Sequence, residues 1–225
     1  MRKAVLHLKK SDPLMRAIIE RVGPCRMEFG EPTFHSLAEA IVYQQLNGKA
    51  AATIFKRFTA LTGDPVTPEG ILKLSAEQLR AVGLSKQKSS YLFDMAERAH
   101  RGELAFSKLA EMTDDEVIEH LTQVKGVGVW TAHMFLMFTL QRANVLPIGD
   151  FGIRMAMHKH YLEHAAKKKN GAGKRKNKKT LAKAPKVKIT LPTPEQMEKI
   201  AKRWEPYRSI ACWYLWRSLD TKTIG

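Results

Sequence analysis

The alternation of hydrophobic and polar positions predicts helices along nearly the whole chain and little strand. From Phe34 to Phe58 the apolar positions recur with a helical period that Asn47-Gly48 interrupts, which indicates helix, tight turn, helix. Ser75 precedes Gln78 by three positions, a spacing typical of a capping box at a helix start. We therefore predict an all-α fold. Further helices are expected to start at Thr67-Pro68, to span 86–100 and about 113–121, to start at Thr193 and to occupy the aromatic stretch 204–219.

A glycine-containing hairpin is the most informative local pattern. Residues 124–128 join a predicted helix that ends near Gln123 to one that starts near Val129. Gly126 and Gly128 permit positive φ and carry no side chains, so backbone N–H groups at the start of the second helix can approach an anion such as a DNA phosphate. An ordinary tight turn between packed helices is the alternative, and two glycines alone do not distinguish the two.

Composition is that of a globular protein large enough for a sizeable core. The chain of 225 residues is 44% hydrophobic, whereas disordered chains lack such apolar surface. No apolar run approaches the roughly 20 residues that span a bilayer, and residues 1–10 lack the features of a secretory signal. We expect a cytoplasmic protein. Cys25 and Cys212 stand far apart, so no disulfide framework is indicated, and Cys212 is expected to be a buried, inert thiol.

Positive charge favours a polyanionic partner such as nucleic acid, because the chain has a net charge of +16 and a pI near 9.9. Most of the excess lies in residues 165–188, which hold ten Lys, one Arg and no acid and leave +5 for the rest of the chain. Their composition cannot bury a face, which indicates a basic flexible insertion. Two interpretations stay open: a solvated loop, or an arm that follows DNA phosphates and adds salt-dependent affinity.

Four segments resemble the helix-hairpin-helix DNA glycosylase superfamily, in particular its bacterial 3-methyladenine DNA glycosylase II branch. The likeness runs from Phe34 to Trp216 and is interrupted by the basic insertion. The segments are, in chain order, YQQLNGKAA, VKGVGVWTAHMF, LPIGDFGIR and RWEPYRSIACWYLW.

The resemblance implies a single domain, 1–225, of two helical lobes that flank a DNA-binding cleft. One lobe is expected over about 34–150 with the hairpin at 124–128, and the N-terminal segment together with 151–225 is expected to form the other. Because the segment before Phe34 is short, we expect the compact form of the family, without the extra N-terminal domain of some members.

Asp150 matches the catalytic aspartate of the family. Breaking an N-glycosidic bond builds positive charge on the sugar, and a fixed carboxylate nearby stabilises that charge and can orient water. Ile148-Gly149 precedes the aspartate and Phe151 follows it, so we expect it at a helix start among apolar groups. Capping of the helix that runs to Met157 is the alternative role, and the two roles can coexist.

The position two residues after the second hairpin glycine separates two reaction types in the family. Bifunctional relatives have a lysine there, whose amine attacks the sugar and leads to strand cleavage. Trp130 occupies this position in the present chain. The resemblance therefore implies a monofunctional glycosylase that leaves an abasic site.

A base pocket is needed because the target atom can be reached only when its nucleotide is flipped out of the duplex. Aromatic walls suit an alkylated, positively charged purine through stacking and cation–π attraction. Met134 stands where some relatives carry tyrosine, which leaves the preferred lesion open. Core packing is the alternative for each aromatic residue, and it is the expectation for Trp213 and Tyr214. The pocket residues expected from the resemblance are Tyr43, Trp130, Met134, Phe151 and Trp216.

Flipping leaves a gap in the duplex that a side-chain wedge fills. The resemblance points to Gln45 or Leu46, and it leaves open which of the two is the wedge, with a buried helix position as the alternative for each. A monovalent cation on the carbonyls of Val124 and Gly126 is compatible with the family likeness, and no other metal or cofactor is expected. The residues expected to contact DNA on and after the hairpin are Lys125, Gly126, Val127, Gly128 and Thr131.

Three histidines follow the helix that starts at Asp150, at positions 158, 160 and 164. Only His160 and His164 are one helical turn apart, and no cysteine or clear carboxylate completes a metal site. We therefore expect a solvated histidine cluster.

The expected function is that of a hydrolase, a monofunctional DNA glycosylase of base excision repair. It would act as a monomer on double-stranded DNA, in the cytoplasm at the nucleoid, and remove alkylated purines of the 3-methyladenine and 7-methylguanine type. A noncatalytic helix-hairpin-helix DNA-binding module is one alternative, although such a module needs neither Asp150 nor an aromatic pocket. A bifunctional glycosylase-lyase is another, which Trp130 disfavours.

Overall fold

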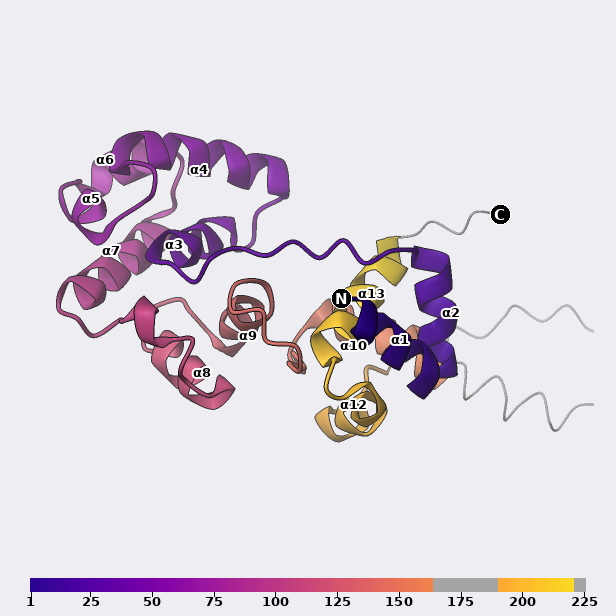
Figure 1. Cartoon of the computed structure of the whole chain (residues 1–225). Helices are drawn as coiled ribbons and strands as arrows, with labels where there is room; N and C mark the ends of the chain where they lie inside the picture. The colour runs from indigo at the N-terminus through magenta and orange to yellow at the C-terminus, as the bar shows by residue number, and fades with distance from the viewer. Residues whose placement is uncertain (164–189, 221–225) are drawn as a thin grey trace, which may run out of the picture. The chain divides into compact units, whose positions relative to one another are not determined.

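The computed structural model describes residues 1–163 and 190–220, and within these ranges all regular secondary structure is helical (Figure 1). The prediction of an all-α fold is confirmed. The basic insertion predicted at 165–188 lies outside the described residues, as does His164.

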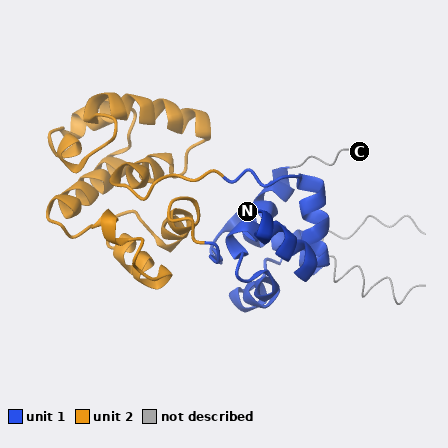
Figure 2. Ribbon diagram, viewed as in Figure 1, with its two compact units in different colours: residues 1–27, 143–225 blue, residues 28–142 orange. Residues whose placement is uncertain are grey.

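The chain divides into two compact units, coloured separately in Figure 2. Unit 1 comprises residues 1–27 and 143–225, and unit 2 comprises residues 28–142. These boundaries differ from the expected ones, which gave one lobe all of 34–150.

Hydrogen bonds explain why the segment that leads to Asp150 belongs to unit 1. The carbonyl of Ala143 accepts the N–H of Ser209 at 2.9 Å. The N–H of Val145 donates to the hydroxyl of Ser209 at 3.0 Å. Because Ser209 lies on the C-terminal helix of unit 1, the candidate catalytic aspartate is fixed to that helix bundle.

Three helices of unit 2 begin at Asn47, Ser75 and Thr113, where the sequence predicts a break or a helix start. Asn47 accepts the N–H of Ala50 on its side chain at 2.9 Å and starts a new helix after the predicted break. Ser75 and Thr113 each form a complete capping box with the residue three positions later. The elements are α3 (Phe34–Tyr43), α4 (Gly48–Thr62), α5 (Pro68–Leu72), α6 (Ala76–Ala81), α7 (Lys86–His100), η1 (Phe106–Lys108), α8 (Asp114–Thr122) and α9 (Val129–Phe138).

Helix α7 is central to unit 2, where it packs against α3, α5 and α6. Leu92 and Met95 of α7 are fully buried. Helix α9 packs against α8 and buries Phe135 and Leu136. This core supports two segments of functional interest, the turn at 44–47 and the hairpin at 124–128.

Unit 1 is organised around a buried carboxylate. One oxygen of Asp12 caps α2 by accepting the N–H groups of Leu14 and Met15. The other accepts the hydroxyl of Tyr161 at 2.8 Å and the indole N–H of Trp204 at 2.9 Å. Four donors therefore compensate its burial. The elements are α1 (Arg2–Ser11), α2 (Pro13–Val22), α10 (Phe151–Met157), η2 (His158–Leu162), α12 (Pro194–Ala201), η3 (Lys202–Trp204) and α13 (Arg208–Asp220).

Helix α13 packs against α10, α2 and α1. Cys212, Trp213 and Tyr214 are buried in this contact, which confirms the expected core positions. Burial raises the pKa of the Cys212 thiol, and the negative charge of Asp150 raises it further. The thiol is therefore protonated and inert at neutral pH.

The expectation of a solvated histidine cluster is wrong for the two histidines that the structure describes. His158 is buried, and His160 is partly buried with its ring nitrogen 2.9 Å from the hydroxyl of Ser218 on α13. The reason is that η2 directly continues α10, and α10 packs against α13. The two histidines therefore lie beside the core of unit 1 rather than in solvent. Among the described residues, no group of three potential ligands is placed to hold a metal ion.

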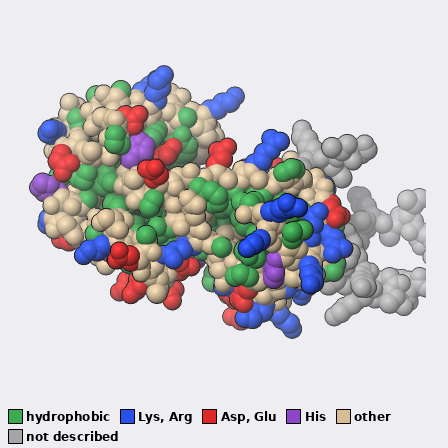
Figure 3. Space-filling view, in the orientation of Figure 1, with side chains coloured by type: hydrophobic (Ala, Val, Ile, Leu, Met, Phe, Trp, Pro, Cys, Tyr) green, Lys and Arg blue, Asp and Glu red, His purple; other side chains and the backbone are tan. Residues whose placement is uncertain are grey.

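The surface of unit 1 is rich in basic side chains on the face drawn in Figure 3. Helix α1 contributes exposed Arg2, Lys3 and Lys10 to the surface of this unit. No helix in the described ranges combines the length and hydrophobicity that a membrane crossing requires.

Candidate active site and DNA-binding hairpin

Asp150 is the N-cap of α10, so the capping role given as the alternative for this residue is present. Its Oδ1 accepts the N–H of Ile153 at 2.7 Å, and its own N–H donates to the carbonyl of Pro147 at 2.9 Å. The side chain is only 7% exposed. A carboxylate at this position is stabilised by the positive end of the helix dipole.

Trp216 of α13 holds the same carboxylate oxygen from a second direction. Its indole N–H donates to Oδ1 of Asp150 at 2.8 Å. Gly152 makes room for the indole, because a Cβ there would lie 2.9 Å from Cδ1 of Trp216 and 3.2 Å from Oδ1 of Asp150. The orientation of the carboxylate is therefore fixed by two donors and by a glycine that the sequence did not single out.

An exposed aromatic side chain lies next in sequence to this buried acid. Phe151 is 67% exposed, although it is the first residue of α10. Such an arrangement offers a flat surface for stacking beside a negative charge held in a fixed orientation. The carboxylate can stabilise positive charge that develops on a bound group, and it can accept a proton from water.

The hairpin has the predicted helix ends, but only one of its glycines has positive φ. Gly126 has φ 79°, and a Cβ there would overlap the ring of Tyr91 on α7. Gly128 has φ −96°, which any residue can adopt, so this position does not use the positive φ that glycine permits. Gly128 is the N-cap of α9 and provides no side-chain cap. The start of α9 therefore presents backbone rather than side-chain groups.

Two hairpin residues expected to contact DNA, Lys125 and Val127, make contacts within the protein instead. Lys125 donates its N–H to Oδ2 of Asp94 at 2.9 Å, and its ammonium lies 3.4 Å from Oδ1 of the same side chain. The side chain of Val127 is buried, and its N–H donates to the carbonyl of Val124 at 3.0 Å. The charge of Lys125 is thus partly balanced by a neighbour before any phosphate binds.

A third residue of this set, Thr131, is also turned inward. Its side chain is 6% exposed, and its hydroxyl accepts a hydrogen bond from the amide of Gln44 at 3.3 Å. The same amide donates to the carbonyl of Gly126 at 2.9 Å. The carbonyls of Val124 and Gly126, which the family likeness makes candidate cation ligands, therefore each accept one hydrogen bond from the protein.

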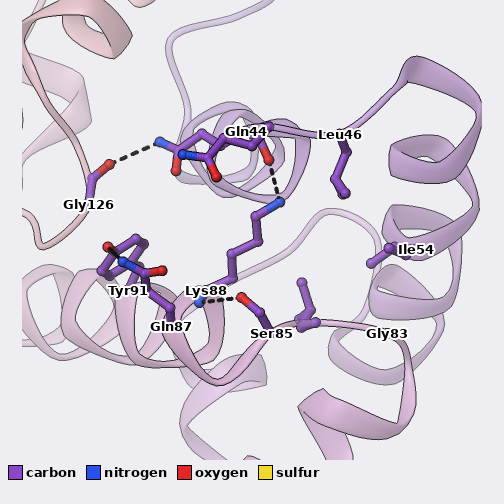
Figure 4. Close-up of a pocket in the computed structure, with 11 residues that line it drawn as sticks. Gln44, Leu46, Ile54, Gly83, Ser85, Gln87, Lys88, Tyr91 and Gly126 are labelled. Carbon is purple, nitrogen blue, oxygen red and sulfur yellow. Dashed lines mark hydrogen bonds between the residues drawn. The ribbon is translucent and has the colours of Figure 1, made fainter.

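The candidate wedge residues lie in the turn between α3 and α4. Gln45 has φ 57° and is exposed, and Leu46 is exposed beside it. Both line a cavity of about 330 Å³ between this turn, α7 and Gly126 (Figure 4). Lys88 and Gln44 also line this cavity. Lys88 donates to the carbonyl of Val42 and the amide of Gln44 donates to the carbonyl of Gly126, and the sequence predicted neither contact.

The predicted pocket residues fall in both units. Trp130 and Met134 are one turn apart on α9, so they share a face of that helix, and Trp130 is 47% exposed. Tyr43 is the last residue of α3 and is partly buried. These three belong to unit 2, whereas Phe151 and Trp216 belong to unit 1.

The sequence pattern of the HhH-GPD superfamily of base excision DNA repair proteins matches residues 38–183. The chain belongs to this superfamily. The relationship stated from the four segments is confirmed, and Asp150 and the hairpin lie within the matched range of the HhH-GPD pattern.

Individual HhH-GPD relatives extend the likeness to nearly the whole chain. DNA-3-methyladenine glycosylase 1 of Schizosaccharomyces pombe is 34% identical over 223 residues, which cover 96% of this chain and 86% of the relative. The structure of the 3-methyladenine DNA glycosylase of the same organism in complex with abasic DNA has a TM-score of 0.73 at 33% identity and 97% coverage of both chains. A DNA-3-methyladenine glycosidase from Bacillus halodurans has a TM-score of 0.74 at 32% identity, with 97% of this chain and 89% of that chain covered.

Proposed function

We propose that this protein is a DNA glycosylase of base excision repair that hydrolyses the N-glycosidic bond of alkylated purines in duplex DNA. The observation that carries the proposal is the buried carboxylate of Asp150, held at the start of α10 by Ile153 and Trp216. The names of its relatives as 3-methyladenine glycosylases support the same substrate class.

The chemistry follows from a fixed negative charge. The bond between the sugar C1′ and the base nitrogen breaks, and its electron pair leaves with the base. The sugar becomes oxocarbenium-like, and Asp150 stabilises this positive charge. Water then bonds to C1′ and releases a proton, for which Asp150 is the acceptor. An alkylated purine carries positive charge and departs readily, so the enzyme needs no strong general acid.

Binding of the flipped nucleotide is assigned to exposed aromatic surfaces and to the hairpin. In unit 1, the exposed Phe151 beside Asp150 offers a stacking surface for the base. In unit 2, Trp130 is an exposed aromatic surface of its own, and the start of α9 offers backbone groups to a phosphate. Gln45 or Leu46 fills the gap that the base leaves. We expect the protein to act as a monomer on double-stranded DNA, in the cytoplasm at the nucleoid.

A monofunctional reaction is favoured over a lyase reaction by the side chain at position 130. Strand cleavage through a Schiff base needs an amine that attacks C1′. The indole of Trp130 has no such amine. The product is therefore an abasic site in an intact strand.

The proposal is tested with duplexes that contain 3-methyladenine or 7-methylguanine, scored for released base, abasic sites and strand nicks. Base release with intact strands is expected. Asp150→Asn removes the negative charge but keeps a side-chain oxygen for the N–H of Ile153, so it should fold, bind an abasic duplex and lose roughly 100-fold or more of the excision rate. Retained activity in this variant would overturn the role of Asp150. Binding without release from any lesion would point to a noncatalytic module, and nicks would point to a lyase.

A further inference from the structure

The turn at residues 44–47 has a strained backbone at its centre. Gln45 has φ 57°, in the left-handed region that costs a non-glycine residue about 1–3 kcal/mol. Such a conformation persists only where surrounding contacts hold it. The side chain of Gln45 is exposed, so the holding contacts come from its neighbours.

The first of these contacts is made by Lys88 of α7. Its ammonium donates to the carbonyl of Gln44 at 2.6 Å (Figure 4). It also donates to the carbonyl of Val42 at 2.6 Å. These carbonyls lie at the C-terminal end of α3, where backbone acceptors lack partners within the helix. A cation at this end also complements the helix dipole. Lys88 thereby caps α3 and fixes the point where the turn begins.

The second contact connects the turn to the hairpin. The side-chain amide of Gln44 donates to the carbonyl of Gly126 at 2.9 Å and to the hydroxyl of Thr131 at 3.3 Å. Gly126 in turn lies directly against the ring of Tyr91, which is three residues after Lys88 on α7. One face of α7 therefore supports both the turn and the hairpin.

We infer that Lys88 and Gln44 are positioning residues that hold the DNA-inserting turn at a fixed distance from the phosphate-binding hairpin. The inference rests on the proposed function. A wedge must unstack base pairs, which costs a few kcal/mol, and a turn free to move would also lose conformational entropy on insertion. Through this link, a backbone phosphate bound at the hairpin places Gln45 and Leu46 at the position of the lesion.

The alternative role for Lys88 is direct contact with a DNA phosphate. Two of its three N–H groups already donate to carbonyls, and burial lowers the pKa of its ammonium. Lys86, two residues earlier on α7, is exposed and has the same charge. Lys86→Met is therefore a control that removes an equal charge without touching the turn.

The test compares Lys88→Met and Gln44→Met with Lys86→Met. Single-turnover excision is measured on one lesion in duplex and in single-stranded DNA, since only the duplex needs a wedge. A 2-aminopurine beside an abasic-site analogue reports insertion by its fluorescence. Lys88→Met and Gln44→Met should lower duplex excision at least about tenfold and reduce the fluorescence change, while single-strand excision stays within about twofold of wild type. Lys88→Arg, which can still donate to both carbonyls, should keep most of the wild-type rate of duplex excision.

Three results would overturn the inference. Equal losses on duplex and single strand would show a general structural defect, which thermal unfolding of each variant would also reveal. Unchanged duplex excision would show that the contacts position nothing. A greater loss of affinity for undamaged duplex in Lys88→Met than in Lys86→Met would make Lys88 a phosphate ligand. If wild type excises neither substrate, the proposed function fails, whereas the fluorescence change still tests the positioning of the turn.

Discussion

The indole N–H of Trp216 donates to Oδ1 of Asp150 at 2.8 Å, and the N–H of Ile153 donates to the same oxygen at 2.7 Å. One donor comes from α13 and the other from α10, so the relative position of these two helices sets the direction in which the carboxylate points. A tryptophan expected only as part of a base pocket therefore also orients the proposed catalytic group. Hydrogen bonds to a charged group contribute about 1.5–3 kcal/mol.

We predict that Trp216→Phe lowers kcat for base excision by roughly 10- to 100-fold with little change in KM. The variant keeps an aromatic ring for packing and stacking but removes the N–H that orients Asp150, and the loss corresponds to one charge-assisted hydrogen bond. Steady-state excision of 7-methylguanine from duplex DNA measures both constants. Trp213→Phe is the control, because Trp213 is buried in the core of unit 1. Similar kcat values for Trp216→Phe and wild type would exclude the orienting role.

Gly152→Ala should reduce excision at least about tenfold, because its methyl group would displace the indole of Trp216 or the carboxylate of Asp150. Gly149→Ala is the matched control: a Cβ at position 149 would meet no atom within 4 Å. Excision rates and thermal unfolding of the two variants are compared. A Gly152→Ala enzyme as active as Gly149→Ala would show that the indole tolerates the methyl group.

Local sequence signals predicted many of the helices from residue 34 onward, whereas they identified neither of the two helices within residues 2–22. The break at Asn47, the capping box at Ser75 and the helix start at Asp150 depend on residues within three or four positions of one another, and the structure has all of them. The helix ends on either side of residues 124–128 were predicted for the same reason. Such signals are independent of tertiary contacts, so they can be recognised in a single sequence.

Contacts between distant residues were not predicted. Trp216 and Asp150 are 66 positions apart, and the amide of Gln44 contacts a carbonyl 82 positions away. Nothing in the sequence around Gly152 indicates that an indole lies against it. The expectation of solvated histidines failed at His158 and His160 for the same reason, since their burial depends on the packing of unit 1.

The two hairpin glycines should differ in what their replacement changes. Gly126→Ala places a Cβ at positive φ and against Tyr91, so it should destabilise the protein by about 1–3 kcal/mol. Gly128→Ala has neither problem and should change stability by less than about 0.5 kcal/mol. If the backbone at 128 approaches a phosphate, the methyl group of the Gly128→Ala variant should still weaken duplex binding about tenfold. Urea unfolding and duplex titration at fixed salt measure the two effects, and a stable Gly126→Ala variant would contradict the prediction.

His160 should make the protein less stable as the pH falls below neutrality. Burial, with help from Arg21 and Lys159, lowers the pKa of its imidazole from 6.5 to about 4. The unfolded chain therefore binds a proton at this site that the folded chain does not, and the free energy of unfolding decreases as the pH falls from 6.5 to about 4.

His160→Gln removes this titration and keeps a polar group that can hydrogen-bond to Ser218. Its free energy of unfolding should decline less than that of wild type over the same pH range, with no further divergence below it. Urea unfolding at several pH values from 6.5 down to about 4 measures the two slopes. Parallel slopes for the variant and wild type would mean that the folded protein accommodates a protonated His160, which would contradict the prediction.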